Sequence, residues 1–329
     1  MIVARAPHRI PLGGGGTDLP SYYEHHGGFI ISAGIDKYVY IYVNRPAADD
    51  LIRVKYSRYE EVNTPDEVEH DLVRPTLKLL GIKNGIEIVS MSDLPAGSGM
   101  GSSSAFIVST LTGLLEMQRK RTPPQSLAEL ACKIEIDLAG HPVGKQDQYM
   151  AAFGGLTKLE ISTTGKVQVS ALDIAADVSE ELQNRMLLYF TGTTRDANKI
   201  LGQQSGELQR EVRAAVDGLH RTKELGYKIL EALEDGELDK FGSLLNQHWE
   251  TKKARSDSVT TIDIDRWYGI ALSAGAQGGK IVGAGEGGFL LLFAPSEAKR
   301  AVRIAMAEEG LREVSYRFDF DGAKVIANV

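Results

Sequence analysis

Glycines and serines crowd the stretch DLPAGSGMGSSSAF, residues 93–106, which runs directly into an apolar segment with helical spacing. A helix begins with unpaired backbone N–H groups and the positive end of its dipole, so its N-terminus attracts anions. Gly97, Gly99 and Gly101 have no side chain that would keep a phosphate from those groups, and the serine hydroxyls can donate to phosphate oxygens. Taken alone, the stretch fits either a phosphate site or a glycine-rich turn with a serine cap. No lysine follows the last glycine, which excludes the P-loop pattern.

Two spaced carboxylates, Glu135 and Asp147, lie in the segment IEIDLAGHPVGKQDQYMAAFGG at residues 134–155. Phosphoryl transfer needs positioning, neutralisation of charge and often a carboxylate near the attacking hydroxyl. Two further glycine-rich segments, RAPHRIPLGGGGTD (5–18) and KIVGAGEGGFLLLF (280–293), lie far from the first. The parts that a phosphoryl-transfer site requires are therefore spread over the whole sequence.

The three glycine-rich segments, in this order and at these distances, resemble the motifs of the GHMP kinases, the galactokinase–homoserine kinase–mevalonate kinase–phosphomevalonate kinase superfamily. The resemblance covers nearly the whole chain. It implies a two-lobed α+β fold, with an N-terminal lobe like ribosomal protein S5 and a C-terminal ferredoxin-like α/β sandwich. It also implies that the middle segment binds ATP, through Gly97, Ser98, Gly99, Met100, Gly101, Ser102, Ser103 and Ser104. Ser104 stands where alanine is commoner in the family.

The same resemblance implies three catalytic roles. It assigns Mg²⁺ to Ser103 and Glu135. It assigns Asp147 to the attacking hydroxyl, either as a base or as an electrostatic orienter. Arg9 stands where sugar kinases of this family place an arginine near that aspartate, and its fixed charge would favour both the carboxylate and the transferring group.

The first motif also bears on the substrate. Thr17 and Asp18 match the T-D pair of sugar kinases in this family, in which the aspartate receives sugar hydroxyls. Gly15 and Gly16 stand where galactokinases have an acid and a histidine, which leaves room for a longer or anionic substrate. With GKQDQYMAAFGG and LNQHWETKKARS, this motif resembles the heptose kinases of the family, which phosphorylate C1 of D-glycero-D-manno-heptose 7-phosphate on the way to nucleotide-activated heptose. The expected substrate residues from the motifs are Gly14, Gly15, Gly16, Thr17, Asp18, Lys280, Gly283 and Gly285.

A phosphorylated substrate needs a cationic pocket. The segments TGTTRDANKIL (191–201) and HWETKKARSDS (248–258) offer basic residues, of which we favour Arg195 and Lys253. Two other functions remain as alternatives: a GHMP kinase for a neutral sugar such as fucose or galactose, and a catalytically silent sugar sensor on the same scaffold. The retained metal and hydroxyl-facing residues argue against the sensor.

Strands and helices must position these residues, and their mixed order favours α+β over a doubly wound sheet. The pattern predicts a first domain over residues 1–175 and a second over 176–329, with no clear period between 162 and 184. Predicted strands are 29–44, 51–57, 85–91, 154–161, 185–192, a pair within 278–295, 311–320 and 323–328. Predicted helices are 68–81, 102–118 with serine caps, 126–140, a region within 195–254, 262–276 and 296–309.

The composition is that of a globular chain of about two domains: 329 residues, 43% hydrophobic, with a net charge of −7. That charge argues against a nucleic-acid or anionic-membrane surface. Cys132 is the one cysteine, so no intramolecular disulfide can form. No secretory signal core and no apolar run of roughly 18 residues is present. We expect a cytoplasmic enzyme whose partners are ATP and a sugar phosphate, and the resemblance implies a homodimer.

Overall fold

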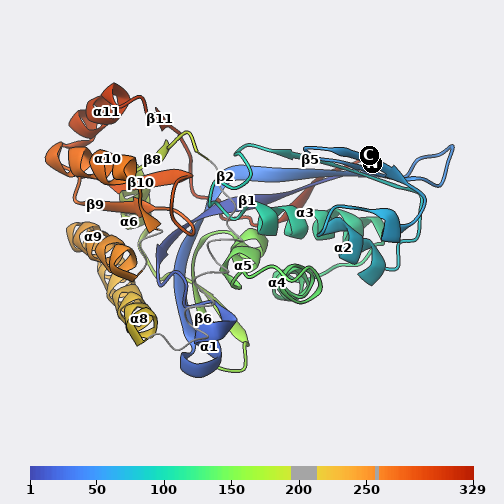
Figure 1. Cartoon of the computed structure of the whole chain (residues 1–329), viewed down its shortest axis with the longest axis horizontal. Helices are drawn as coiled ribbons and strands as arrows, with labels where there is room; N and C mark the ends of the chain where they lie inside the picture. Colours follow the sequence, from blue (N-terminus) through green and yellow to red (C-terminus); the bar gives the residue numbers. More distant parts are fainter. Residues whose placement is uncertain (194–212, 256–258) are drawn as a thin grey trace.

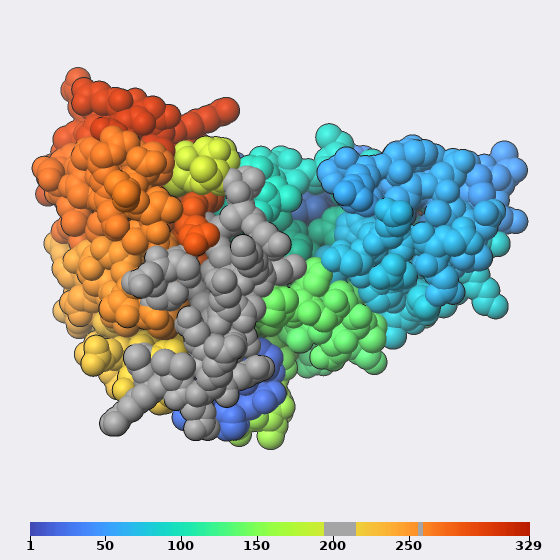
Figure 2. All heavy atoms as spheres, in the orientation of Figure 1, coloured from blue at the N-terminus to red at the C-terminus, as the bar shows by residue number. Residues whose placement is uncertain are grey.

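The computed structural model describes residues 1–193, 213–255 and 259–329 of the chain. It has two lobes, each built on one β-sheet with helices packed against it (Figure 1). In the space-filling view the lobe that contains most of the N-terminal half, in blue and cyan, lies beside the orange and red lobe of the C-terminal half (Figure 2). This arrangement confirms the expected two-lobed α+β fold. No helix among the described residues is long and apolar enough to cross a membrane.

The first lobe contains an eight-stranded sheet in the order β12-β1-β2-β5-β3-β4, with β6 pairing with β2 and β7. Its strands are β1 (Ile2–Gly13), β2 (Gly28–Asn44), β3 (Ile52–Lys55), β4 (Tyr59–Val62), β5 (Ile86–Ser92), β6 (Leu156–Ile161), β7 (Val167–Ala171) and β12 (Lys324–Asn328).

Helices of this lobe gather on one side of the sheet (Figure 1). They are α2 (Val73–Leu79), α3 (Ser102–Met117), α4 (Pro124–Cys132), a π-helical turn (Lys133–Leu138) and α5 (Gln146–Phe153). Helix α1 (Pro20–His26) lies apart from them, at the bottom of the view in Figure 1. The apolar residues of α3 pack with those of β2 and β5 in one buried cluster. The core therefore fixes α3, and with it the loop that precedes α3.

The second lobe contains a four-stranded sheet in the order β11-β8-β10-β9. Its elements are α6 (Ala176–Arg185), β8 (Met186–Phe190), α8 (Arg213–Glu234), α9 (Leu238–Arg255), α10 (Ile262–Ser273), β9 (Gly278–Ile281), β10 (Phe289–Phe293), α11 (Lys299–Glu308) and β11 (Arg312–Glu313). Strand β10 is apolar on both faces: Phe289, Leu291 and Phe293 enter one buried cluster, and Leu290 and Leu292 enter another. Helices therefore cover both faces of the sheet, as a sandwich requires.

Strand β1 positions the first motif, and the sequence did not predict it. Two prolines interrupt its pattern, and the pairing with β2 shifts register between Pro7 and His8 and again after Pro11. Such bulges are where a paired strand tolerates proline. On its other edge β1 pairs with β12 only as far as Arg5, and at Arg9 the backbone N–H donates instead to Met100 O at 3.2 Å. Beyond the end of its pairing with β12, this edge of β1 therefore contacts the glycine-serine loop.

Other segments also differ from the sequence prediction, which gave no element for α1, β4 or α5 and a strand over 311–320 where only Arg312–Glu313 form β11. Residues 162–184, in which the sequence shows no clear period, form β7 and most of α6. Helix α3 begins at Ser102, but its N-cap is Gly101 in a left-handed conformation, and no side chain caps it. Strand β12, late in the second half of the sequence, belongs to the first sheet.

Candidate active site

The centre of the site is an ion pair between Arg9 on β1 and Asp147 in the first turn of α5. Arg9 Nε and Nη2 each donate to one oxygen of the Asp147 carboxylate at 2.6 Å, and Arg9 Nη1 donates to Gly99 O at 2.6 Å. A planar bidentate pair of this kind fixes both side chains. Arg9 is buried, whereas the Asp147 side chain remains 26% exposed. The carboxylate is therefore held in place and still reachable by a ligand.

The glycine-serine loop wraps the N-terminus of α3 beside this pair. Gly97, Gly99 and Gly101 all have φ between 72° and 77°, a region that glycine adopts at little cost. A Cβ on Gly101 would lie 3.2 Å from Asp147 Oδ2, so the loop touches the carboxylate directly. Asp147 therefore lies beside the N-terminus of α3, and Gly101 and Ser102 of that N-terminus line a cavity.

Not every residue of this loop faces the cavity. Gly97, Gly99, Gly101, Ser102 and Ser103 line a cavity of about 570 Å³. Ser98, Met100 and Ser104 are buried and do not line it. The five residues that line the cavity are therefore the candidates for direct contact with phosphate. Ser98, Met100 and Ser104 lie behind them in the protein interior.

Three aromatic side chains form a wall of the same cavity. His70 stacks on Phe106 with ring centroids 4.7 Å apart and an interplanar angle of 9°, and Tyr56 meets His70 edge-on at 4.6 Å. All three side chains line the cavity. Aromatic faces of this kind favour stacking with a flat ring such as a nucleobase.

Glu135 lies in the π-helical turn and is fully buried. Its Oε2 accepts hydrogen bonds from Ser104 Oγ at 2.7 Å and Gln148 Nε2 at 2.8 Å. Its Oε1 has no hydrogen-bond partner and lies 3.7 Å from His141 Nδ1. A buried carboxylate oxygen without a hydrogen-bond donor can serve as a cation ligand, but Glu135 lines neither cavity of the site, whereas Ser103 lines the larger one. The hydroxyl that bonds Glu135 here is Ser104, the serine that departs from the family pattern.

His141 adds a charge that the sequence did not predict. Its Nε2 contacts Asp71 Oδ2 at 2.8 Å, and this hydrogen bond, followed by the influence of Glu135, raises the pKa of His141 to about 9. The bond to His141, followed by one to His70, lowers the pKa of Asp71. Both His141 and Asp71 line the cavity with the aromatic wall.

The residues of the first motif divide into two groups. Thr17 is buried and bonds Gly14 O and Phe29 O, and a Cβ on Gly14 would lie 1.8 Å from Phe29 O. Neither residue lines a cavity at the site, so the structure does not support direct substrate contact by Gly14 and Thr17. Gly15, Gly16 and Asp18 line a second, smaller cavity of about 100 Å³.

Asp18 closes one wall of that smaller cavity. Its Oδ2 accepts the backbone N–H of Gln146 at 3.0 Å, and burial raises the pKa of its carboxyl group. A Cβ on Gly144 would lie 2.0 Å from this oxygen, so a glycine is required there. The contact ties the first motif to the N-terminus of α5, next to Asp147.

Helix α9 and strand β9 supply the basic wall of the smaller cavity. Its lining includes His248, Lys252 and Arg255 of α9 and Lys280 of β9. Burial, followed by the charge of Arg9, lowers the pKa of Lys280 to about 7. Burial and the three neighbouring cations lower the pKa of His248 well below its usual value. The smaller cavity also contains Arg9 and Asp147, which it shares with the larger one.

Lys253 does not lie where the sequence analysis placed it. Its ammonium group contacts Glu250 at 2.9 Å and Asp265 at 3.5 Å, and it lines neither cavity. It follows Lys252 by one residue, which turns it about 100° around the helix. The other favoured cation, Arg195, lies outside the described residues.

The third glycine-rich segment packs directly against the glycine-serine loop. A Cβ on Gly283 (φ 81°) would lie 2.6 Å from Gly99 Cα, and one on Gly288 would lie 2.2 Å from Ser98 O. Gly283 also lines both cavities, whereas Gly285 packs against the backbone of Val259 and lines neither. Glu286 takes a φ of 62°, a conformation that glycine adopts more readily, within this glycine-rich bend.

His248 is one of the site residues that the sequence analysis missed, and its spacing could have revealed it. Residues 248, 252 and 255 follow the i, i+4, i+7 pattern of one helix face. Applied to HWETKKARS, that pattern selects Lys252 and excludes Lys253.

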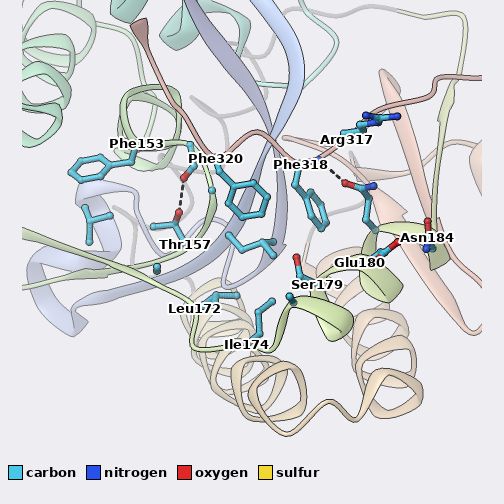
Figure 3. A pocket seen from close by; sticks show the side chains of 17 residues that line it. Phe153, Thr157, Leu172, Ile174, Ser179, Glu180, Asn184, Arg317, Phe318 and Phe320 are labelled. Atoms are coloured by element: carbon cyan, nitrogen blue, oxygen red, sulfur yellow. Dashed lines mark hydrogen bonds between the residues drawn. The ribbon is translucent and has the colours of Figure 1, made fainter.

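A larger cavity, of about 1060 Å³, lies away from Asp147, between β6, α6 and the segment 317–320. Figure 3 shows the aromatic rings of Phe153, Phe318 and Phe320 around it. Its charged side chains are Glu180 and Arg317, and none of the glycine-rich motifs reaches it. It is not part of the site described above.

The chain is similar to known sugar kinases over its whole length. The GHMP kinases N terminal domain matches residues 70–155, and the GHMP kinases C terminal domain matches residues 229–310. The chain is 29% identical to the D-glycero-alpha-D-manno-heptose 7-phosphate kinase of Campylobacter jejuni over 98% of each protein. It is 26% identical to the galactokinase of Pyrococcus furiosus over 96% of this chain and 95% of that protein. The crystal structure of a D-glycero-D-manno-heptose 1-phosphate kinase from Bacteroides thetaiotaomicron matches it with a TM-score of 0.81, at 26% identity over 100% of both chains.

Proposed function

This chain belongs to the GHMP kinases, and from that premise we propose that it transfers the γ-phosphoryl group of ATP to the anomeric hydroxyl of D-glycero-D-manno-heptose 7-phosphate. The observation that carries the proposal is the Arg9–Asp147 pair at the junction of two cavities. One cavity has the glycine-serine loop and an aromatic wall, which suit ATP. The other has acidic and basic walls, which suit a sugar that already bears a phosphate.

In the proposed reaction Asp147 accepts a hydrogen bond from the C1 hydroxyl and orients its oxygen toward the γ-phosphorus. The new bond forms between that oxygen and phosphorus while the bond from phosphorus to the bridging oxygen of ADP breaks. Arg9 holds the Asp147 carboxylate through two hydrogen bonds and places a positive charge beside the transferring group. The hydroxyl proton passes to Asp147 or, if Asp147 only orients the hydroxyl, to the solvent.

Mg²⁺ is the metal that this chemistry implies. Ser103 and Glu135 would hold it, because the Glu135 Oε1 atom is buried without a donor and the Ser103 hydroxyl lines the nucleotide cavity. The bound ion would neutralise phosphate charge. We further propose a cytoplasmic location, where ATP and a sugar phosphate meet.

A coupled ADP-release assay with a panel of acceptors tests the function. The panel contains the heptose 7-phosphate, mannose, galactose, fucose and homoserine, with phosphorus NMR of any product. Turnover of the heptose phosphate with a new anomeric phosphate signal is the expected result. Turnover of a neutral sugar alone would overturn the substrate and keep the kinase. Absence of turnover with every acceptor, while ATP still binds, would overturn the reaction.

A further inference from the structure

Three side chains of helix α9, spaced i, i+4 and i+7, form one basic stripe on the smaller cavity. They are His248, Lys252 and Arg255. Lys280, on the neighbouring strand β9, faces the same cavity, and α9 packs against β9 in the C-terminal lobe (Figure 1). Four basic groups from two elements therefore converge on one space of about 100 Å³.

Burial distinguishes two of these four basic groups from ordinary surface cations. His248 and Lys280 are each only 2% exposed. Neither ring nitrogen of His248 has a hydrogen-bond partner, and no carboxylate of the described residues lies within ion-pair distance of Lys280. Lys252 is fixed at the edge of the cavity, because its Nζ donates to Gly283 O at 2.5 Å. Burying polar groups without partners is costly, so their retention indicates a ligand.

The opposite wall determines the net charge of the cavity. The other titratable groups that line it are Arg9, Asp18 and Asp147. Arg9 and Asp147 compensate each other through their bidentate pair, and Asp18 is bonded to a backbone N–H. The α9–β9 wall therefore faces the ligand as a positive surface. A phosphomonoester, which is close to a dianion at neutral pH, complements that surface better than a neutral hydroxyl does.

The glycines of the first motif leave room for such a group. A Cβ on Gly15 would meet no atom within 4 Å, so a glycine there keeps the space open. A Cβ on Gly16 would lie 3.5 Å from Arg255 Nη1, which places the guanidinium beside the first motif.

We propose that His248, Lys252, Arg255 and Lys280 form the subsite for the phosphate that the sugar carries before the reaction. The inference rests on the proposed function and deepens it, because it names the residues that select a phosphorylated sugar. The sugar then spans the cavity, with its phosphate on the α9–β9 wall and its anomeric hydroxyl at Asp147.

Proton uptake should accompany binding. With the pKa of Lys280 lowered to about 7 by burial and by Arg9, much of this lysine is neutral above that pH in the empty site. A phosphate dianion beside it favours the charged form, so the pKa of Lys280 rises on binding. Affinity for the phosphorylated sugar should therefore fall as the pH increases above 7.

The first test compares steady-state kinetics of four variants with the heptose 7-phosphate. Lys252→Met and Lys280→Met should each raise KM for the sugar phosphate about 10- to 100-fold, the value of one charge-assisted hydrogen bond, with KM for ATP unchanged. Lys240→Met is the matched control, because Lys240 lies on the same helix, exposed and paired with Glu237. Lys253→Met tests the rival position. A large rise in KM with Lys253→Met alone would overturn the subsite.

A second test separates the subsite from the reaction. Calorimetry measures binding of inorganic phosphate to the enzyme saturated with a non-hydrolysable ATP analogue, so that the glycine-serine loop is occupied. Wild type should bind phosphate and take up protons at pH 8, and Lys280→Met should lose both. If that result holds but the heptose phosphate is not a substrate, the proposed function fails and the subsite stands. If the heptose phosphate is turned over while both variants keep wild-type KM and phosphate binding, the subsite fails and the function stands.

Discussion

Replacing Gly283 with alanine should disturb the ATP loop from the other lobe of the molecule. Gly283 has a φ of 81°, where a residue with a side chain costs roughly 1–2 kcal/mol. Its new Cβ would also lie 2.6 Å from Gly99 Cα and 2.7 Å from Gly99 O, well inside ordinary contact distances. Relief of such overpacking costs about 1–3 kcal/mol. We therefore expect a total loss of about 2–5 kcal/mol in the free energy of unfolding.

The chain offers a control that isolates the contact from the backbone strain. Gly81 follows α2 with a φ of 67°, and a Cβ there would meet no atom within 4 Å. Gly81→Ala should cost only the strain, roughly 1–2 kcal/mol, and leave the kinetics unchanged. Urea unfolding measures the stability of both variants, and a titration with ATP measures KM.

For Gly283→Ala we expect KM for ATP to rise as well, because Gly99 can relieve the overlap only by moving the loop. Equal stability losses in the two variants, with a wild-type KM for ATP in both, would refute the idea that the third motif supports the loop.

Three further predictions follow from the site. Asp147→Asn should lower kcat by about 10²- to 10⁴-fold without loss of ATP binding, whereas Asp137→Asn, an exposed acid of the neighbouring turn, should be close to wild type in the same assay. Glu135→Gln should raise the Mg²⁺ concentration for half-maximal rate by at least about tenfold, and an unchanged Mg²⁺ titration would remove Glu135 from the metal site. Lys280→Met should stabilise the empty enzyme: the folded pKa lies near 7, below that of an unfolded lysine, so the charged form opposes folding. The gain in the free energy of unfolding should be largest below pH 7 and shrink as the pH rises toward 10. Thermal melts of wild type and Lys280→Met measure it at pH 6.5 and 9.5, and an equal difference at the two pH values would contradict the prediction.

The sequence predicted best what depends on short-range pattern. The glycine-serine loop, the α3 helix behind it and the strand-turn-strand around Gly283 all follow from local composition, and the structure has each of them. The resemblance to the GHMP kinases also implied that Arg9 lies near Asp147, and the two are in direct contact. The catalytic and metal roles of these residues stay predictions.

What the sequence analysis missed depends on long-range packing. Strand β1 has prolines at its bulges, so its sequence shows no regular alternation of polar and apolar residues. It is identified as a strand only by its pairing with β2 and β12. The choice between Lys252 and Lys253 depends on which face of α9 turns toward β9; neither lysine indicates that face alone, and only the spacing to His248 and Arg255 does so. The bond from Ser104 to Glu135 joins residues that only the packing of α3 against the π-helical turn brings together.

The pairing of β12 with β1 has a consequence for how the protein is made. The first lobe contains residues from the start of the sequence and also residues 324–328, so its sheet cannot be completed while the second lobe is still being synthesised. Until then the outer edge of β1, from Ile2 to Arg5, has unpaired N–H and C=O groups that invite pairing with another chain. A nascent chain therefore passes through a stage in which this edge of the first sheet is open, and that stage ends only when β12 has been synthesised.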